Sequence, residues 1–168
     1  MAIIEVADCH RLGNSGFPAG SARLGKMLKL TKRADYGLIA MRHLAEHPVS
    51  CSAKDIAESH GIPPELLAKI LQRLVKGGLL LSHHGINGGY MLARDPRTIS
   101  AYDVIKAIEG PPLLTSCVST RGECEQTSRC TVREPLRRVS QSIEEVLSKL
   151  TIYDMTEPEK VPELVSIG

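Results

Sequence analysis

Residues 52–92, SAKDIAESHGIPPELLAKILQRLVKGGLLLSHHGINGGYML, decide the fold of this 168-residue chain. The capping-box pattern at the start of the stretch predicts a short helix that ends near Gly61. A second helix is predicted to begin at Pro63–Pro64, because proline is tolerated in a first helical turn, and to end at Gly77–Gly78. Two helices joined by a tight turn that contains glycine are typical of a helix-turn-helix.

The outward side of the second helix carries long hydrogen-bonding side chains, of the kind that contact base edges in a DNA groove. They are Glu65, Lys69, Gln72, Arg73 and Lys76. A solvated surface face is the alternative interpretation of the same residues. The segment after this helix favours DNA contact, because residues 79–81 and 90–93 predict two strands and Asn87–Gly88 predicts the turn between them. A hairpin directly after a recognition helix is a wing, and His84 lies near its tip.

Three further helices are predicted around this unit. The first covers about residues 31–46 with Thr31 as its N-cap. Another opens at a capping box, Ser100 to Asp103, and the last is long and is capped by the Thr131–Glu134 pattern. Apolar residues of the long helix repeat at intervals of four and three: Val132, Leu136, Val139, Ile143, Val146 and Leu150.

This heptad-like seam could pack on its own domain or on a second copy of the chain. With a DNA-reading unit upstream, we favour a dimerisation helix. A two-fold dimer would read a palindromic site with half-sites about one or two helical turns apart.

The predicted fold class is mainly α with a small β-hairpin wing: a winged helix-turn-helix plus a long dimerisation helix. Residues 1–26 are rich in glycine and predict a poorly ordered extension. Residues 27–99 form the predicted DNA-binding domain, residues 100–155 the cysteine loop and dimerisation helix, and residues 156–168 a tail. A core of useful size can form in a chain of this length without disulfides.

The net charge of +2 does not by itself indicate a nucleic-acid binder, but Lys32 and Arg33 belong to a basic cluster before the first helix. No secretory signal is recognisable, and no apolar run approaches the roughly 20 residues that span a membrane. We therefore expect a cytoplasmic protein whose thiols stay reduced. No nucleophile–base set or phosphate loop indicates an enzyme, because Gly85 to Gly89 fits a wing turn better.

Three cysteines, Cys117, Cys124 and Cys130, lie in a short polar segment after the wing, with six and five residues between them. Soft sulfur ligands select zinc, copper(I) or iron–sulfur clusters. Zinc sites usually contain a tighter Cys pair, so the wide spacing favours a cluster. A disulfide with one spare thiol, a zinc site and inert thiols remain alternatives. A fourth ligand would be a carboxylate, a small molecule or a group from another subunit.

Several segments resemble bacterial winged-helix regulators typified by IscR, NsrR and RirA. They are residues 30–37 (LTKRADYG), 55–57 (DIA), 74–79 (LVKGGL) and 85–93 (GINGGYMLA), followed by the cysteine loop and the long helix. The resemblance runs from about Met27 to Met155. The stretch CTVR at 130–133 looks most like the branch that regulates the SUF operon for iron–sulfur assembly.

The resemblance implies a homodimer that holds one iron–sulfur cluster (2Fe–2S or 4Fe–4S) per subunit through Cys117, Cys124 and Cys130, with cluster state setting operator affinity. IscR-like members have a histidine three residues after the third cysteine, where this chain has Arg133. NsrR-like members use an aspartate from the partner subunit, and Asp35 occupies that position. We hypothesise that Asp35 is the fourth ligand; a carboxylate that interacts only with the helix dipole is the alternative.

The resemblance also shows where base recognition differs. His84 stands where IscR has an arginine, and Ala68 replaces an acidic residue, so the operator sequence does not carry over. We expect base contacts from the second helix of the helix-turn-helix, and contacts that position the DNA backbone from Thr31, Lys32 and His84.

The predicted function is a DNA-binding transcriptional regulator, such as a repressor, that senses iron–sulfur status, iron, redox state or nitric oxide and controls cluster-assembly genes. Its predicted partners are double-stranded operator DNA and a second copy of the chain. The alternative is a thiol-redox or metal-binding protein without a DNA role, which predicts reversible disulfides and no operator binding.

Overall fold

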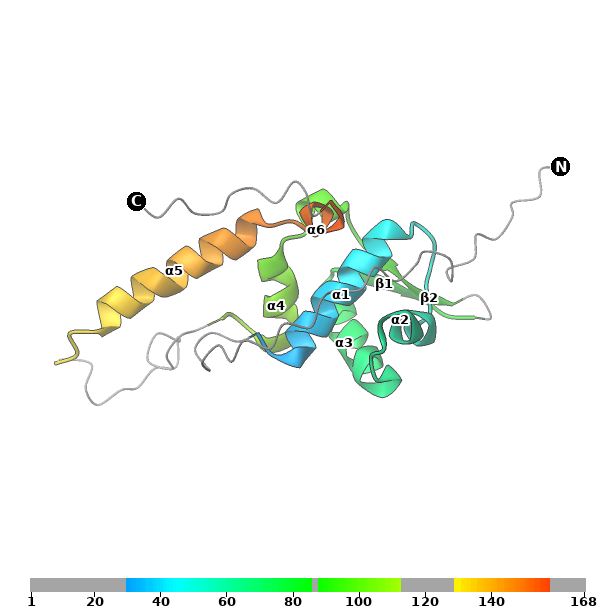
Figure 1. The fold of residues 1–168 in the computed structure, drawn as a ribbon, viewed down its shortest axis with the longest axis horizontal. Coiled ribbons are helices and arrows are strands. Elements are labelled where there is room, and N and C mark those ends of the chain that lie inside the picture. The colour runs from blue at the N-terminus through cyan, green and yellow to red at the C-terminus, as the bar shows by residue number, and fades with distance from the viewer. Residues whose placement is uncertain (1–29, 86–87, 113–128, 158–168) are drawn as a thin grey trace, which may run out of the picture.

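The computed structural model describes residues 30–85, 88–112 and 129–157. The order of elements is α1 (Lys32–Glu46), α2 (Ala53–His60), α3 (Pro64–Lys76), β1 (Leu80–His83), β2 (Gly89–Leu92), the 3₁₀ helix η1 (Pro96–Thr98), α4 (Ala101–Glu109), α5 (Arg133–Lys149) and α6 (Ile152–Thr156). These helices and the one hairpin confirm the predicted fold class (Figure 1). The predicted extension over residues 1–26 and most of the predicted tail lie outside the described residues.

Side chains that precede the helices fix where several of them begin. The backbone N–H of Ala34 donates to Thr31 Oγ1 at 3.3 Å, and that of Asp55 donates to Ser52 Oγ at 3.1 Å. Both halves of the predicted capping box form between Ser100 and Asp103. Each bond satisfies a backbone donor that has no partner within its own helix, so these starts are encoded locally.

The predicted cap of the long helix at Thr131 is wrong. The N-cap of α5 is Val132, and no side chain accepts a hydrogen bond from the first turn. The Glu134 carboxylate, which would have completed the box, instead accepts hydrogen bonds from Arg137 and Arg138. These bonds, with that to Arg137 the stronger influence, hold the pKa of Glu134 at about 2. The Glu134 carboxylate is thus paired within its own helix and does not reach back to the N-cap.

The core lies between α1, α3 and α4, with α2 and the wing packed along one side. The inward face of α3 supplies Leu67, Ile70, Leu71 and Leu74, all of them buried. They meet Met41 of α1 and apolar residues of α4. The predicted apolar stripe of the second helix in the helix-turn-helix is therefore the stripe that the fold buries.

The helices α1 and α4 approach most closely at Gly37. A Cβ atom at this position would overlap with the Cδ1 methyl of Ile108. Glycine is thus required for packing rather than for an unusual backbone angle. The last turn of α4 is thereby fixed against the middle of α1.

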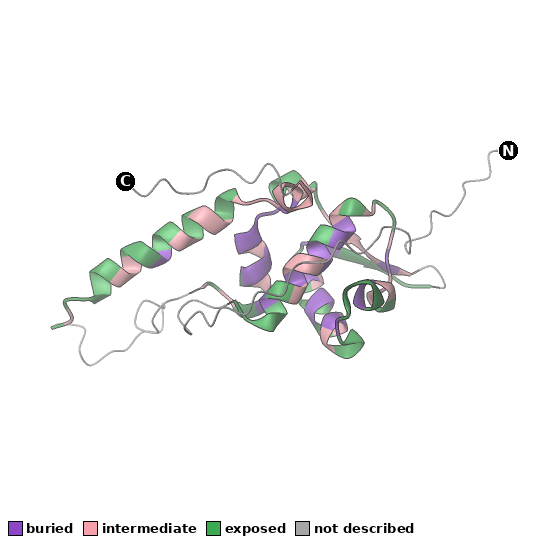
Figure 2. Cartoon of the chain, viewed as in Figure 1, coloured by how far each residue is buried: buried purple, intermediate pink, exposed green. Residues whose placement is uncertain are grey.

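The helix α5 projects from this body and is anchored at its C-terminal end (Figures 1 and 2). The N–H of Ala101 donates to the carbonyl of Leu150, and the N–H of Ile152 donates to the carbonyl of Ile99, both at 2.8 Å. Ser140 is the only fully buried residue of α5. Among the described residues, no helix is both long enough and apolar enough to cross a bilayer.

Candidate DNA-binding interface

A groove of about 540 Å³ lies between the start of α2, one side of α3 and the wing. The helix α3 contributes Gln72, Val75 and Lys76 to its wall. The wing contributes residues from both strands and from the turn, His84 among them. Ser52 and Ala53 close the remaining side. The fold thus brings the predicted residues Gln72 and His84 to one surface.

The start of α2 lines this groove at Ser52 and Ala53. The helix has eight residues, and Ser52 occupies one of its N-terminal donors as the cap. The remaining first-turn N–H groups and the positive end of the helix dipole favour negative charge. Lys76 adds a cation on the opposite wall. A phosphate backbone matches this arrangement, since it presents acceptors and negative charge along a line.

Backbone pairing with the loop before α2 positions the wing. The N–H of Cys51 donates to the carbonyl of Tyr90 at 3.1 Å, and the N–H of Tyr90 donates to the carbonyl of Cys51 at 2.8 Å. A Cβ on Gly89 would lie 2.5 Å from the Cys51 carbonyl oxygen, so only glycine permits this approach. The strands β1 and β2 pair antiparallel from Leu80 opposite Leu92 to His83 opposite Gly89.

The predicted contacts at the start of α3 are exposed, but they do not line the groove. Glu65 lies in the first turn of α3 and Lys69 in the second, both open to solvent. They extend the outward side of the recognition helix beyond the groove. A ligand longer than the groove, such as a duplex, could therefore contact α3 along its whole outward side.

Arg73, a predicted base contact, bonds to another helix of its own chain in this structure. Its guanidinium donates a hydrogen bond to the backbone carbonyl of Ile108, in the last turn of α4. That carbonyl is among the last of α4, where a helix lacks backbone donors of its own. Arg73 therefore ties the recognition helix to α4 in this structure, and a base contact from its side chain stays a prediction.

Thr31 and Lys32 lie at the start of α1, away from the wing (Figure 1). Both are exposed. The Thr31 hydroxyl caps α1 and also donates to the Glu109 carboxylate at the end of α4. The structure therefore does not bring these two residues together with the groove, and their predicted contact with the DNA backbone would use a separate surface.

Of the predicted cluster ligands, Cys117 and Cys124 lie outside the described residues. Cys130 is half-buried just before α5, and Asp35 is exposed in the first turn of α1. The starts of α1 and α5 are well separated within one chain (Figure 1). Within the described ranges, no three His, Cys, Asp or Glu side chains are arranged to hold a metal ion.

Prediction from sequence assigns Lys76 to the outward side of the recognition helix, and this residue lines the groove in the structure. It does not assign Ser52 or His83 to the interface, although both line the groove. The sequence pattern marks Ser52 as a helix cap only. His83 is predicted within the wing turn, and the observed register instead makes it the last residue of β1.

Comparison with known proteins agrees with this geometry. The model of the Rrf2 family, described as an iron-dependent transcriptional regulator, matches residues 30–158. The HTH-type transcriptional regulator IscR of Vibrio vulnificus is 33% identical over 141 residues, which cover 82% of each chain. An rrf2-like HTH-type regulator of Rhodobacter capsulatus is 29% identical and covers 75% of this chain and 91% of its own.

Solved structures show the same fold. IscR of T. potens superposes with a TM-score of 0.63 at 32% identity, over 82% of this chain and 93% of that chain. CymR, the global cysteine regulator of B. subtilis, superposes with a TM-score of 0.62 at 29% identity, over 79% of this chain and 98% of its own.

Proposed function

Because the chain belongs to the Rrf2 family of transcriptional regulators, we propose that it binds operator DNA as a homodimer and that an iron–sulfur cluster on its cysteine loop controls the binding. The chain is a transcriptional regulator and not an enzyme. This membership favours regulation over the alternative of a thiol-redox protein without a DNA role. Since operator DNA is in the cytoplasm of a bacterial cell, we place the protein there.

The groove between α2, α3 and the wing is the observation that carries the DNA-binding part of the proposal. A major groove admits an α-helix, and long polar side chains on that helix read the base edges. Gln72 and Lys69 are our candidates for such readout, with Glu65 at the leading end of α3. His84 on the wing and the start of α2 would hold the adjacent phosphates.

The exposed seam of α5 supports the homodimer. Val132 is 57% exposed and Val139 is 47% exposed, and no residue of the predicted seam is fully buried in the single chain. The helix α5 has 17 residues, so at 1.5 Å per residue its apolar stripe is about 25 Å long. Stripes of this kind mark interaction surfaces. A second α5 packed along the same seam would give a two-fold dimer and a palindromic operator.

The donor set supports the cluster. Three thiols of one loop suit an iron–sulfur centre, and we propose that Cys130, a free and half-buried thiol, is one of its ligands. Asp35 is a carboxylate in the first turn of α1, and the start of α1 is well separated from the start of α5 in one chain (Figure 1). We therefore propose that Asp35 of one subunit completes the ligand set of the other. When bound, the cluster supplies a group that responds to iron, oxidants and nitric oxide.

The last turn of α4 offers a route from the cysteine loop to the recognition helix. Gly110 ends α4, and the segment with the three cysteines follows it. Just before this point Ile108 packs on Gly37 of α1 and accepts the hydrogen bond of Arg73 from α3. A shift of this turn would move α3. A cluster can control DNA affinity only if two conformations of the protein bind the cluster with different affinity. We propose that these two conformations differ at the last turn of α4.

We propose that its target genes encode iron–sulfur assembly proteins, because the stretch CTVR at residues 130–133 resembles the regulators of the SUF operon. Feedback would follow directly, because a regulator that carries a cluster reports the supply of clusters. Sensing of iron or nitric oxide through the same cysteines would use the same ligand set and a different target operon.

The test begins with protein purified without oxygen. We would record its visible iron–sulfide absorption and its affinity for duplexes that it selects from a random-sequence pool, before and after cluster removal. We expect the affinity to change on removal. Cys117→Ser, Cys124→Ser and Cys130→Ser should abolish both the absorption and the change, whereas Cys9→Ser should not. A colourless, metal-free protein with unchanged affinity would refute the cluster part alone.

The DNA interface and the dimer need separate variants. Lys69→Ala should weaken binding to the selected duplex, while Lys149→Ala, on α5, should not. Since Lys69 is proposed to read a base edge, its loss should also relax the sequence preference at one position of the duplex. Val139→Asp places a charge in the seam and should yield monomers in sedimentation experiments. Gln141→Asp, an exposed residue of the same helix outside the seam, should leave the dimer intact.

A further inference from the structure

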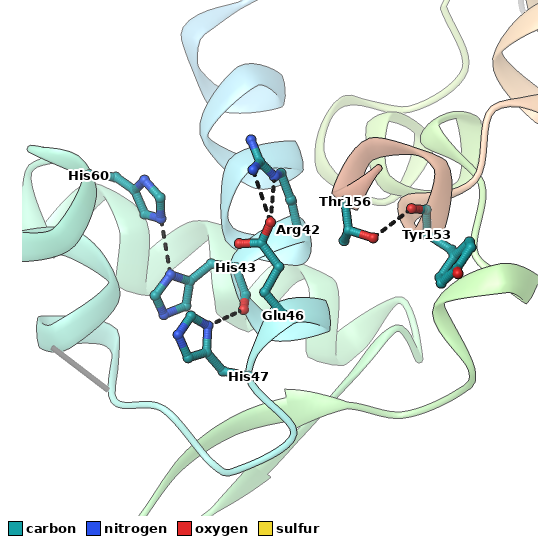
Figure 3. Close-up of polar contacts among 7 residues, drawn as sticks. All are labelled: Arg42, His43, Glu46, His47, His60, Tyr153 and Thr156. Carbon is teal, nitrogen blue, oxygen red and sulfur yellow. Dashed lines mark hydrogen bonds and ion pairs between the residues drawn. The ribbon is translucent and has the colours of Figure 1, made fainter. Parts of the chain in front are cut away.

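Three histidines gather where α1 meets α2, outside the groove (Figure 3). His43 of α1 is 4% exposed, His47 is the C-cap residue of α1, and His60 is the last residue of α2. His43 Nδ1 lies 3.1 Å from His60 Nε2. The ring of His47 stacks on that of His43 with 4.2 Å between centroids. No part of the proposed DNA or cysteine chemistry uses these rings.

The contact between His43 and His60 depends on protonation. Two ring nitrogens at this distance form a hydrogen bond only if one carries a proton and the other does not. The pair can share one added proton and keep a donor facing an acceptor. A second proton makes both nitrogens donors and places two cations side by side, one of them on the buried ring of His43. His47 does not share this bond, because its Nδ1 lies 2.8 Å from the His43 carbonyl oxygen and donates to it.

The surrounding carboxylates stabilise a doubly protonated pair only in part. On α1, Arg42 and Glu46 form an ion pair of 2.9 Å with each other. On α2, Asp55 is the nearby carboxylate. Burial, and then His47 and His60, lower the pKa of His43 from its ordinary value of 6.5 to about 4, against an opposing effect of Asp55.

His60 is affected in the same direction. Burial lowers its pKa; Glu46 opposes this shift, whereas Arg42 and His47 add to it. Both rings of the pair therefore favour the uncharged form in the folded chain. The folded state loses this advantage as the pH falls below the ordinary histidine value.

We propose that His43 and His60 form an acid-sensitive latch that holds the C-terminal end of α2 against α1. α2 has eight residues and only two that are fully buried, Ile56 and Ala57, so a polar tie at its end contributes substantially to its placement. The other end of α2 forms one side of the groove at Ser52 and Ala53. Opening of the latch at acid pH frees α2 and weakens DNA binding. This last step rests on the proposed interface; the latch itself does not.

The experiment that tests the latch uses the whole protein without DNA. Amide hydrogen exchange, corrected for the intrinsic effect of pH, gives the protection of α2 and α3 between pH 7.5 and pH 4.5. We expect the protection of α2 to fall about tenfold or more over this range, as the pair takes up its second proton, with a smaller change in α3. His60→Gln removes one titrating ring at an exposed position and should clearly reduce the pH dependence of the protection of α2, while the buried His43 retains a smaller part of it. His83→Gln, on the wing, should behave as the unmodified chain.

Two results would overturn the latch: protection of α2 that does not change with pH, or an undiminished change in His60→Gln. The link to function is measured separately, as affinity for the selected duplex at each pH. Protonation of wing histidines strengthens attraction to phosphate, so it changes the affinity in the opposite direction to the latch. A pH response of α2 without weaker DNA binding in acid would retain the latch and refute its link to the groove.

Discussion

Gly37→Ala and Ile108→Val together test the packing that fixes α4 on α1. A Cβ on Gly37 would overlap with the Cδ1 methyl of Ile108, but it would lie 3.5 Å from Ile70 Cγ2 and 3.6 Å from Ile108 Cγ1. The last two are ordinary contact distances. One methyl group therefore excludes alanine from this position, and valine at position 108 lacks that methyl.

The magnitudes follow from opposing effects. Gly37→Ala gains about 1 kcal/mol of helix propensity but loses about 1–3 kcal/mol through overpacking, so we expect a net loss near 1 kcal/mol. Ile108→Val removes a buried methyl and costs about 1 kcal/mol. In the double variant the alanine methyl fills the space that Cδ1 vacates. Both penalties then largely disappear, and the coupling free energy is about 2 kcal/mol.

Urea unfolding followed by circular dichroism measures the four free energies, at a fixed protein concentration because a dimer links stability to concentration. The double variant should equal or exceed the stability of the unmodified chain. Gly37→Ala combined with Ile56→Val, in α2, serves as the control and should be additive. If the first pair is also additive within about 0.5 kcal/mol, the contact does not limit packing and the reasoning is refuted.

Three further outcomes are expected. Ser100→Ala removes half of the capping box of α4 and should lower the free energy of unfolding by about 1 kcal/mol in urea, unlike Ser148→Ala on the exposed side of α5. Gly89→Ala should displace the wing and weaken DNA binding roughly tenfold without loss of helix content, and unchanged affinity would contradict the observed placement of the wing. The free energy of unfolding should fall as the pH drops from 6.5 toward 4, because His43 is protonated more readily in the unfolded chain. At about 1.4 kcal/mol per pKa unit this loss is at most about 3 kcal/mol, and calorimetry at constant ionic strength that finds none would contradict it.

Features encoded within a few residues could be predicted from the sequence. The caps at Thr31, Ser52 and Ser100 form as expected, because donor and acceptor are three residues apart and need no tertiary contact. The hairpin is predicted by its turn signal, although both of its strands are displaced by about one residue. At Thr131 the same local pattern is wrong: α5 begins after Val132 without a side-chain cap, and Glu134 pairs with arginines one turn later.

The groove could be predicted only in part, since its walls come from three elements. Gln72 and His84 could be identified because the order of helix, helix and hairpin places them on one side of a known type of motif. Lys69 and Glu65 lie on the outward side of α3 but do not line the groove. Helical periodicity predicts the side of a helix on which a residue lies, but not how far along the helix the groove extends. The cysteine ligands remain predictions, since two of the three lie outside the described residues.

Arg73 shows where prediction from the sequence ends. An arginine on the outward side of a recognition helix has the same sequence pattern whether it meets a base edge or another part of its own fold. Here Arg73 donates to the carbonyl of Ile108 in α4, which lies 35 residues further along the chain. His43 is a similar case: its spacing from His47 is visible in the sequence, but its bond to His60 exists only because α2 docks beside α1. In both cases the residue type states what a side chain can do, and the tertiary contact determines which of those possibilities the folded protein uses.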